Sequence, residues 1–336
     1  MHRTHYIKDA KNEIGKTVKI AGWVHDFRDM GKLKFVLVIF KAKAIAAKAF
    51  REKLNELRFI EIQPSAISGA ATEGGSDVFS LKYFENQAFL VQSPQLQKQM
   101  AVVGGMDRVM MTVPVFRAEK HNTTSHLNEI TQMDIEMGFA DHNDAMNILE
   151  QVTLHMLKSV KESEIGTEID KTFGELIVPT KVPRYSYKSL VEKLNANGFE
   201  MKHGWDFTKE AEKKLHELLG DELYFIYDWP TAVRAFYSMP DEENPETCHA
   251  FDLMYRGLEI SSGAKRIHIP ALLEQQLKKR GLDPLNFEFY INAFRMGAPP
   301  HAGWSVGLER LTMKMCKQEN IRECMLFPRD RTRLMP

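Results

Sequence analysis

The sequence predicts an α+β domain built around a largely antiparallel β-sheet, and three observations support this fold class. Short apolar runs with strand character alternate irregularly with longer helical patterns, without a regular βαβ order. The 336 residues, 43% of them hydrophobic, are enough to bury a large core. Charged side chains interrupt the apolar segment 114–139, which indicates a sheet with one polar face.

The N-terminal part contains two strand patterns followed by a helical pattern. TVKIAGWV (17–24) and KLKFVLVIF (32–40) read as strands joined by a polar turn. From about residue 41 to residue 57, apolar residues recur at helical spacing. RFIEIQP (58–64) then alternates like a strand and ends at Pro64.

A glycine-rich segment separates this strand from the next one. ISGAATEGGSDVF (67–79) holds small residues around Glu73, so we expect a loop that can close on a ligand. AFLVQ (88–92) is a further strand. Ser93 as N-cap and Pro94 in the first turn predict the start of a helix.

The remaining elements complete the expected α+β domain. Helices are expected up to about Lys161 and again across 186–219. The C-terminal part, with LYFIYDWP, AFDLMYRGLEISSGA and GWSVGLERLTMKM, is rich in strands and ends in a helix. We therefore expect an antiparallel sheet flanked by helices.

Composition narrows the possible functions. The formal net charge is zero, so any contact with nucleic acid must use a local basic patch. The three cysteines have neither metal-ligand nor disulfide spacing, which indicates a reducing compartment. The polar N-terminus has no apolar signal core, and no segment approaches the ~20 apolar residues of a membrane span. We expect a cytoplasmic protein with no membrane contact.

Polar clusters in strand-like segments are the candidate site. Each cluster alone is more often a solvated ion pair than a site. Together they offer arginines that grip phosphate or carboxylate, and carboxylates that suit Mg²⁺. This combination fits a nucleoside triphosphate beside a small acidic substrate. The clusters are Glu73, Gln95 with Lys98, Arg117 and Glu119 with Asp134, Asp252 with Glu259 and Arg266, and Arg310.

Several segments, in the expected order, resemble one enzyme family. PVFRAEKHNTTSHLNE resembles motif 2 of the class II aminoacyl-tRNA synthetases, GAPPHAGWSVGLERL resembles motif 3, and FIEIQP resembles the end of motif 1. TEGGSDVF, QSPQLQKQ, TQMDIEM, FDLMYRGLEISSGAKR and LFPRDRTRLMP are similar to segments of the aspartyl-tRNA synthetases of the archaeal and eukaryotic type. The resemblance runs from about residue 41 to residue 336. It implies that the polar face is the floor of an active site.

The resemblance implies a role for each cluster. Arg117, Glu259 and Arg310 would be catalytic: Arg117 would contact the α-phosphate and the aspartate carboxylate, and Arg310 would lie over the adenine and reach the γ-phosphate. Glu119 would read the adenine amino group. The full ATP-binding set would be Arg117, Ala118, Glu119, Ser125, His126, Leu127, Glu259, Gly307, Leu308, Glu309 and Arg310.

The resemblance also implies an aspartate site and a magnesium site. Lys98 and Arg266 would clamp the substrate's side-chain carboxylate, and asparagine would leave these two buried cations unpaired. Glu259 and Ser262, with Asp252, would hold Mg²⁺ as the cofactor. The aspartate-binding set would be Glu73, Gln95, Lys98, Arg117, Asp134, Ser262 and Arg266.

The first 40 residues resemble only the opening of the family's anticodon-binding OB barrel. We therefore expect a truncated OB-like remnant over 1–40 and a class II catalytic domain over 41–336, which would bind tRNA by its acceptor end and leave the anticodon unbound. Ser125 departs from the family, in which an arginine often precedes the motif 2 histidine. A homodimer is expected from motif 1.

Three functions follow from these features. The first is an aspartate–tRNA ligase that uses L-aspartate, ATP and tRNA. The second is a paralogue that passes the aspartyl adenylate to ammonia, as an asparagine synthetase. The third is a non-catalytic dimeric binding module, which the intact Arg117, Glu259 and Arg310 disfavour.

Overall fold

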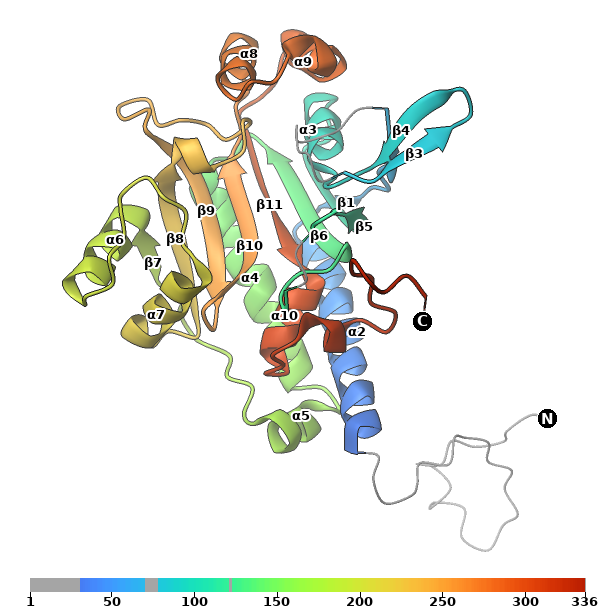
Figure 1. Cartoon of the computed structure of the whole chain (residues 1–336), viewed down its shortest axis with the longest axis vertical. Coiled ribbons are helices and arrows are strands. Elements are labelled where there is room, and N and C mark those ends of the chain that lie inside the picture. The colour runs from blue at the N-terminus through green and yellow to red at the C-terminus, as the bar shows by residue number, and fades with distance from the viewer. Residues whose placement is uncertain (1–30, 70–77, 121–122, 336) are drawn as a thin grey trace, which may run out of the picture. The chain divides into compact units, whose positions relative to one another are not determined.

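The computed structural model describes residues 31–69, 78–120 and 123–335 (Figure 1). The predicted strand 17–24 and Glu73 lie outside these ranges. Contacts between Cα atoms divide the chain into two units, 1–37 and 38–336. The described elements belong to the second unit, except for residues 31–37 of the helix Gly31–Glu56. No helix of the described ranges is long and apolar enough to cross a membrane.

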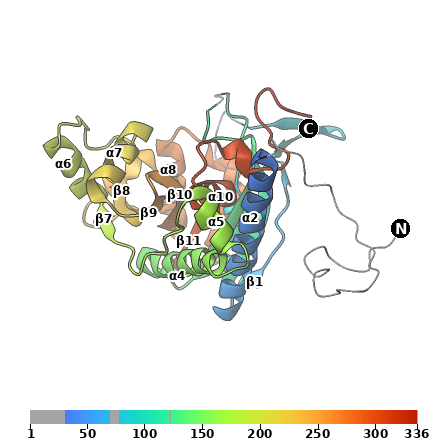
Figure 2. The same cartoon turned by 90° about the horizontal axis from the view of Figure 1, so that it is seen from below.

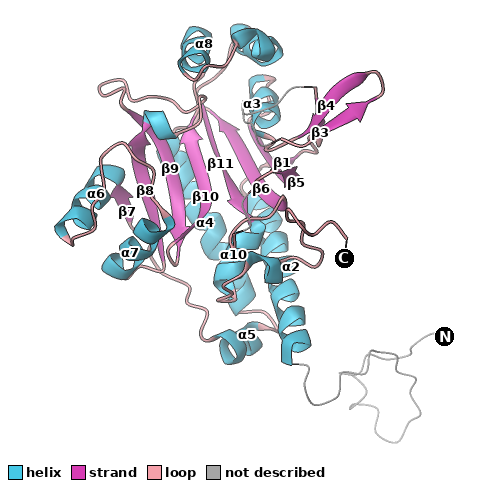
Figure 3. Ribbon diagram, in the orientation of Figure 1, coloured by secondary structure: helices cyan, strands magenta, loops and turns pink. Residues whose placement is uncertain are grey.

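A mixed, mainly antiparallel sheet organises this unit (Figure 3). In the described ranges its strand order is β1-β5-β6-β11-β10-β9-β8-β7, and only the β1–β5 and β7–β8 pairs are parallel. The predicted fold class is confirmed. The strands are β1 (Ile60–Glu61), β5 (Arg108–Phe116), β6 (Glu129–Gly138), β7 (Arg184–Ser186), β8 (Leu223–Pro230), β9 (Thr247–Tyr255), β10 (Leu258–Lys265) and β11 (His301–Gly307).

The two faces of the central strands differ because side chains alternate along a strand. On β6, Met133, Ile135 and Met137 point into the main core, while Asp134 and Glu136 lie on the opposite face. Helices α2 and α4 cover the apolar face (Figure 2). The polar face is thus left for the site.

The helices have sequence features that explain their bounds. In α4 (His142–Lys161), Asp141 and Asp144 form a capping box, and one stripe of apolar residues is buried against the sheet. Helix α3 (Gln95–Val103) begins one residue later than the Ser93 cap predicted, although Ser93 Oγ does accept a hydrogen bond from the Gln95 amide at 3.2 Å. The other helices are α5 (Gly166–Phe173), α6 (Tyr187–Ala196), α7 (Lys209–Leu219), α8 (Pro270–Lys279), α9 (Glu288–Arg295) and α10 (Leu308–Met315), with 3₁₀ turns at Thr231–Val233, Pro284–Phe287 and Ile321–Cys324.

The predicted strand 32–40 is wrong. Residues 31–56 form one helix, α2 (Gly31–Glu56), which also includes the helix expected from residue 41. Val38, Ala42, Ala46 and Phe50 recur at intervals of four residues and are all buried in the main core. Burial of this helical stripe outweighs the β-propensity of the valine and isoleucine residues. The assignment of 1–40 to an OB remnant stays a prediction.

A small sheet stands beside the main one. β2 (Ile67–Ser68) and β3 (Ser80–Tyr83) both pair with β4 (Asn86–Leu90) in an antiparallel arrangement. The predicted strand 88–92 is confirmed with a shift of two residues, whereas only Ile60–Glu61 of the predicted strand 58–64 is a strand.

Candidate active site

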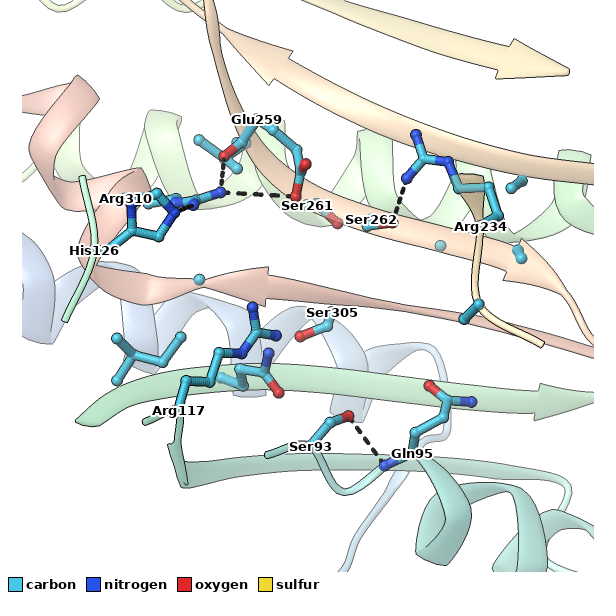
Figure 4. Close-up of a pocket in the computed structure, with 18 of the residues that line it drawn as sticks. Ser93, Gln95, Arg117, His126, Arg234, Glu259, Ser261, Ser262, Ser305 and Arg310 are labelled. Atoms are coloured by element: carbon cyan, nitrogen blue, oxygen red, sulfur yellow. Dashed lines mark hydrogen bonds and ion pairs between the residues drawn. The ribbon is translucent and has the colours of Figure 1, made fainter. Parts of the chain in front are cut away.

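A cavity of about 450 Å³ lies over the polar face of the sheet (Figure 4). Its walls come from the end of β5, the segment that follows it, and strands β6, β10 and β11. Of the predicted residues, those that line it are Gln95, Arg117, Glu119, Ser125, His126, Leu127, Glu259, Ser262, Arg266, Gly307, Glu309 and Arg310. Each cluster within the described ranges therefore contributes at least one residue to the same cavity.

Arg117 is an available cation in this cavity. It follows the last residue of β5, and its backbone amide bonds to the Asn128 carbonyl at 2.9 Å, which fixes the chain where the side chain leaves the strand. Within the described ranges its guanidinium has no hydrogen-bond or ion-pair partner. Figure 4 shows it pointing into the cavity. A guanidinium in this position is free to bind an anion.

Arg310 lies opposite, in the first turn of α10. Its guanidinium donates to the Glu259 carbonyl at 3.0 Å and lies 3.3 Å from His126 Nε2. His126 Nε2 is also 3.8 Å from the Glu119 carboxylate. These contacts hold a planar cation and a carboxylate on one side of the cavity.

Lys209 adds a cation that the sequence did not indicate. It is the first residue of α7, and its Nζ donates to Ser125 Oγ at 2.6 Å. Within the described ranges Lys209 forms no salt bridge. Because Ser125 lines the cavity, the ammonium is held at its edge.

Carboxyl groups gather beside Arg234 at the β9–β10 pair. The two terminal nitrogens of the Arg234 guanidinium donate to the Asp252 carboxylate, and Nη1 lies 3.5 Å from Ser262 Oγ. Burial raises the pKa of Asp252; Arg234 lowers it and Glu259 raises it further. Burial, and next the Glu259 carboxylate, raise the pKa of Glu212 to about 8. This region holds more negative charge than its arginine neutralises.

A fully buried ionic network lies beneath the other side of the cavity. Lys98 Nζ is 2.7 Å from Asp134 Oδ1, 3.6 Å from Glu136 Oε2 and 3.1 Å from the Trp304 carbonyl oxygen. Arg266 Nε donates to Glu136 Oε1 at 2.9 Å. Burial raises the pKa of Glu136, but Arg266 and Lys98 outweigh it and leave the pKa below its usual value. Glu136 therefore bridges the two cations.

Glycine at position 303 makes room for this network. A Cβ atom there would lie 2.2 Å from Glu136 Oε2 and 2.4 Å from the Ile135 carbonyl oxygen. Any side chain at this point of β11 would displace the Glu136 carboxylate.

A chain of polar contacts fixes Gln95 at the cavity wall. Its side-chain amide donates to Gln99 Oε1 at 2.8 Å, and Tyr290 donates to the same oxygen at 3.0 Å. Gln99 Nε2 lies 2.9 Å from Nε2 of His301, whose Nδ1 is 2.8 Å from the Pro299 carbonyl oxygen. The Gln95 side chain is thus preorganised by buried partners.

Some predicted residues do not reach the cavity. Lys98, Asp134 and Asp252 lie behind its wall, and Ala118 and Leu308 are not among the lining residues either. Glu309 lines the cavity, but its carboxylate is taken up by Lys43 Nζ at 2.7 Å and the Thr131 amide at 2.9 Å. It ties α2 to α10.

Sequence reasoning missed Glu136, Arg234, Lys209 and Glu212 as site residues. Glu136 had a visible signal, since it lies two positions after Asp134 on the same strand face. Arg234 lies in the irregular segment after β8, and both Lys209 and Glu212 lie on α7. Their approach to the site depends on tertiary packing that no local pattern shows.

Comparisons with known proteins agree on one family. Residues 25–331 match the family described as tRNA synthetases class II (D, K and N). The chain is 50% identical over 311 residues to the aspartate–tRNA(Asp/Asn) ligase of Methanocaldococcus jannaschii, covering 92% of this chain and 70% of that protein. It is 48% identical over 301 residues to the aspartate–tRNA(Asp) ligase of Picrophilus torridus, with 89% and 70% covered.

Solved structures give the same result. Asparaginyl-tRNA synthetase from Pyrococcus horikoshii, complexed with asparaginyl-adenylate, superimposes with a TM-score of 0.86 at 31% identity, covering 90% of this chain and 70% of that one. Aspartyl-tRNA synthetase from Entamoeba histolytica gives 0.80 at 32% identity, with 98% and 67% covered. With its eight-stranded sheet, polar cavity and motifs, the chain belongs to the class II tRNA synthetases of the D, K and N group.

Proposed function

We propose that this chain is an aspartate–tRNA ligase. L-Aspartate attacks the α-phosphate of ATP, forming aspartyl-adenylate and releasing pyrophosphate. The aspartyl group then passes to the 3′-hydroxyl of the terminal adenosine of a tRNA, and AMP leaves. Relatives at 44–50% identity named as aspartate–tRNA ligases favour tRNA over ammonia as the acceptor.

The unpaired Arg117 guanidinium is the observation that carries this proposal. The attacking carboxylate is already a nucleophile, so the first step needs no general base. It needs alignment of the two reactants and neutralisation of the charge that builds up on the phosphorus oxygens. Arg117 has no partner within the described ranges and lines the same cavity as Arg310 and Arg266, so it is placed to bind both anionic reactants.

We assign the nucleotide to the side of Arg310. Its guanidinium, held by the Glu259 carbonyl, would cover the adenine and reach the phosphates, and Glu119 would accept from the adenine amino group. Lys209, hydrogen-bonded to Ser125, would supply a further positive charge at the phosphate end. By resemblance, the family often has an arginine at the position of Ser125. Lys209 would supply the positive charge that this serine lacks.

We assign the substrate side chain to Arg266, with Lys98 behind it. The expectation that asparagine would leave two unpaired buried cations is wrong, because Asp134 and Glu136 already pair them. Selectivity must then come from donor geometry. Arg266 offers only N–H groups, which a carboxylate oxygen accepts and an amide NH₂ group cannot. Losing one charge-assisted hydrogen bond costs roughly 1.5–3 kcal/mol.

Mg²⁺ fits the carboxylate side of the cavity. Glu259 and Ser262 line the cavity, and Asp252 lies behind its wall, paired with Ser262 across the β9–β10 ladder. All three offer only oxygen donors, the type that Mg²⁺ prefers. The raised pKa values of Asp252 and Glu212 indicate excess negative charge that a cation would relieve. Asp252 keeps free lone pairs beside Arg234, since each carboxylate oxygen has two. When bound, Mg²⁺ would neutralise part of the triphosphate charge.

A homodimer is also part of the proposal. β1 is a short parallel edge strand, and its Ile60 side chain is 54% exposed. The resemblance assigns this segment to motif 1, which forms the subunit interface in the family. Sedimentation at micromolar concentration should give the mass of two chains, and a monomer would contradict this assignment.

The test of function compares acceptors. The protein is supplied with ATP and labelled aspartate, and then with tRNA(Asp), tRNA(Asn) or ammonium ions. We expect labelled aminoacyl-tRNA to accumulate and no asparagine to form. Asparagine formation with ammonium, and no charging of either tRNA, would contradict the proposal. Charging of tRNA(Asn) beside tRNA(Asp) would show which type of relative this chain follows.

A further inference from the structure

Two histidines and an aspartate lie together away from the cavity. His142 begins α4, Asp228 belongs to β8 and His249 belongs to β9. One potential ligand atom of each lies within 4.8 Å of the others. None of the three lines the 450 Å³ cavity. We propose that they form a binding site for a divalent transition-metal ion such as Zn²⁺.

The nitrogen atoms of the two imidazole rings are unequally used. Nδ1 of His142 and Nδ1 of His249 are both buried and have no hydrogen-bond partner. The other nitrogens differ: His249 Nε2 is 3.5 Å from the Asp241 carboxylate, an acceptor that suits an outer partner, whereas the side-chain amide nitrogen of Asn143 donates to His142 Nε2 at 3.3 Å. When His142 Nδ1 binds the ion, Nε2 carries the proton, so the Asn143 amide must turn to present its oxygen. Metal-binding histidines commonly have one nitrogen on the ion and the other held by an outer partner.

The backbone brings the carboxylate to the two rings. Asp228 has φ +57°, a left-handed conformation that is uncommon for residues other than glycine. It lies at the register shift between Tyr227 and Trp229, where the β8–β9 ladder is interrupted. Bulges of this kind redirect a side chain. Within the described ranges the Asp228 carboxylate has no hydrogen-bond or ion-pair partner, so the strained residue presents a free acceptor.

The nearby Asp141 is not a ligand. Its Oδ1 accepts from the amides of Asn143 at 2.7 Å and Asp144 at 3.0 Å, as the cap of α4. The donor set is therefore two imidazole nitrogens and one carboxylate oxygen, with a coordination position left for water. This set suits Zn²⁺ and its neighbours, whereas Mg²⁺ prefers oxygen donors only.

Binding requires a modest local movement. Tetrahedral ligands about 2.1 Å from Zn²⁺ lie about 3.4 Å apart, so atoms up to 4.8 Å apart must approach by up to about 1.4 Å. The rings of His142 and His249 are stacked at 4.6 Å with 8° between their planes. One ring must turn about its Cβ–Cγ bond for both Nδ1 atoms to face one ion, and this torsion has a broad energy profile. The bound ion would join the start of α4 to β8 and β9.

The test is calorimetric titration of the full-length protein with Zn²⁺ at saturating Mg²⁺, followed by thermal melting. We expect one Zn²⁺ per chain and a higher melting temperature with Zn²⁺ than with a chelator. The H142N/H249N double variant should lose this site and the thermal shift. D241N, which leaves all three ligands intact, should weaken binding by about tenfold. The matched control is His203→Asn, at an exposed histidine outside the cluster.

Four outcomes would overturn the proposal. One is that the wild-type protein binds no Zn²⁺ under these conditions, which needs no variant to interpret. Another is that the folded double variant binds Zn²⁺ as tightly as the wild type. The third is that His203→Asn removes the site. If the double variant does not fold, Co²⁺ bound to the wild-type protein must show the absorption of a four-coordinate site with nitrogen ligands, and its absence would overturn the proposal equally.

Discussion

The two sides of the cavity differ in how far their charged side chains are buried and paired. On the side that we assign to aspartate, Lys98, Asp134, Glu136 and Arg266 are at most 4% exposed, and each has a charged partner. On the side that we assign to the nucleotide, and within the described ranges, Arg117 has no partner and Lys209 has only a serine hydroxyl. A buried, fully paired network fixes geometry, and solvent-accessible cations neutralise a ligand that brings its own charge. Variants of the buried network should therefore lose stability as well as activity, and variants of the unpaired cations should lose activity alone.

The largest effect is expected from Lys98→Leu. The change leaves Asp134 as a buried carboxylate without its cation, which should destabilise the fold by about 3–5 kcal/mol. Aspartate-dependent pyrophosphate exchange should fall much more than ATP binding. Urea unfolding and exchange kinetics measure the two effects. The double variant K98L/D134N should recover part of the stability but not aspartate use; full recovery of both would show that Lys98 has no role at the substrate.

Arg117→Ala should affect catalysis without affecting stability. Removing a cation that meets the developing phosphate charge should lower kcat/KM by about 10²–10³. Because the guanidinium has no partner within the described ranges, the unfolding free energy should change by less than about 0.5 kcal/mol. The matched control is Arg108→Ala, at the other end of β5 and outside the cavity. A large loss of stability in R117A, with normal turnover in the remaining folded protein, would contradict the difference proposed between the two sides of the cavity.

Lys209→Ala should have a smaller, nucleotide-specific effect. Its ammonium is partly exposed, so its contribution is roughly 0.5–1 kcal/mol, a two- to fivefold rise in the KM for ATP. The KM for aspartate should not change. Lys214→Ala, on the same helix but outside the cavity, serves as the control. In the K209A background, Ser125→Arg should restore the KM for ATP. If it does not, the proposal that Lys209 lies at the phosphate end of the nucleotide is contradicted.

Glu212→Gln should change the pH dependence of stability and leave the affinity for both substrates unchanged. Burial and Glu259 raise the pKa of Glu212 from 4.5 in the unfolded chain to about 8 in the folded one. The folded state therefore holds the proton more tightly, and the contribution to stability is present below 4.5 and lost as the pH rises to about 8. Urea midpoints measured across this window should fall less for E212Q than for the wild type. If the urea midpoints of E212Q and the wild type fell equally with rising pH, the raised pKa of Glu212 would be contradicted.

The sequence predicts which residues lie on the polar face of the sheet better than it predicts their ion-pair partners. Alternation on β6 shows that Asp134 and Glu136 share a face, and the motifs indicate where Arg117 and Arg310 lie. No local pattern shows that Glu136 neutralises both Lys98 and Arg266, because the three come from different elements. That missing contact made the expectation about asparagine wrong.

The helix at 31–56 is a second case in which a local sequence pattern was not enough. Its first part has the β-branched composition of a strand, and only burial of the stripe through Val38 and Ala42 selects the helix. Arg234 and Lys209 reach the site from segments without a motif, and only tertiary packing places them. Local patterns therefore predict which residues are polar and apolar, and tertiary contacts decide their partners.

The most direct test of the account is ATP–pyrophosphate exchange with aspartate and with asparagine, for the wild type and for Lys98→Leu. If Arg266 and the charges behind it select the substrate carboxylate, aspartate should be preferred by roughly 10- to 150-fold, corresponding to 1.5–3 kcal/mol. The variant should lose part of that preference, because Lys98 and Arg266 share Glu136. Equal exchange with the two amino acids in the wild-type protein would contradict the account.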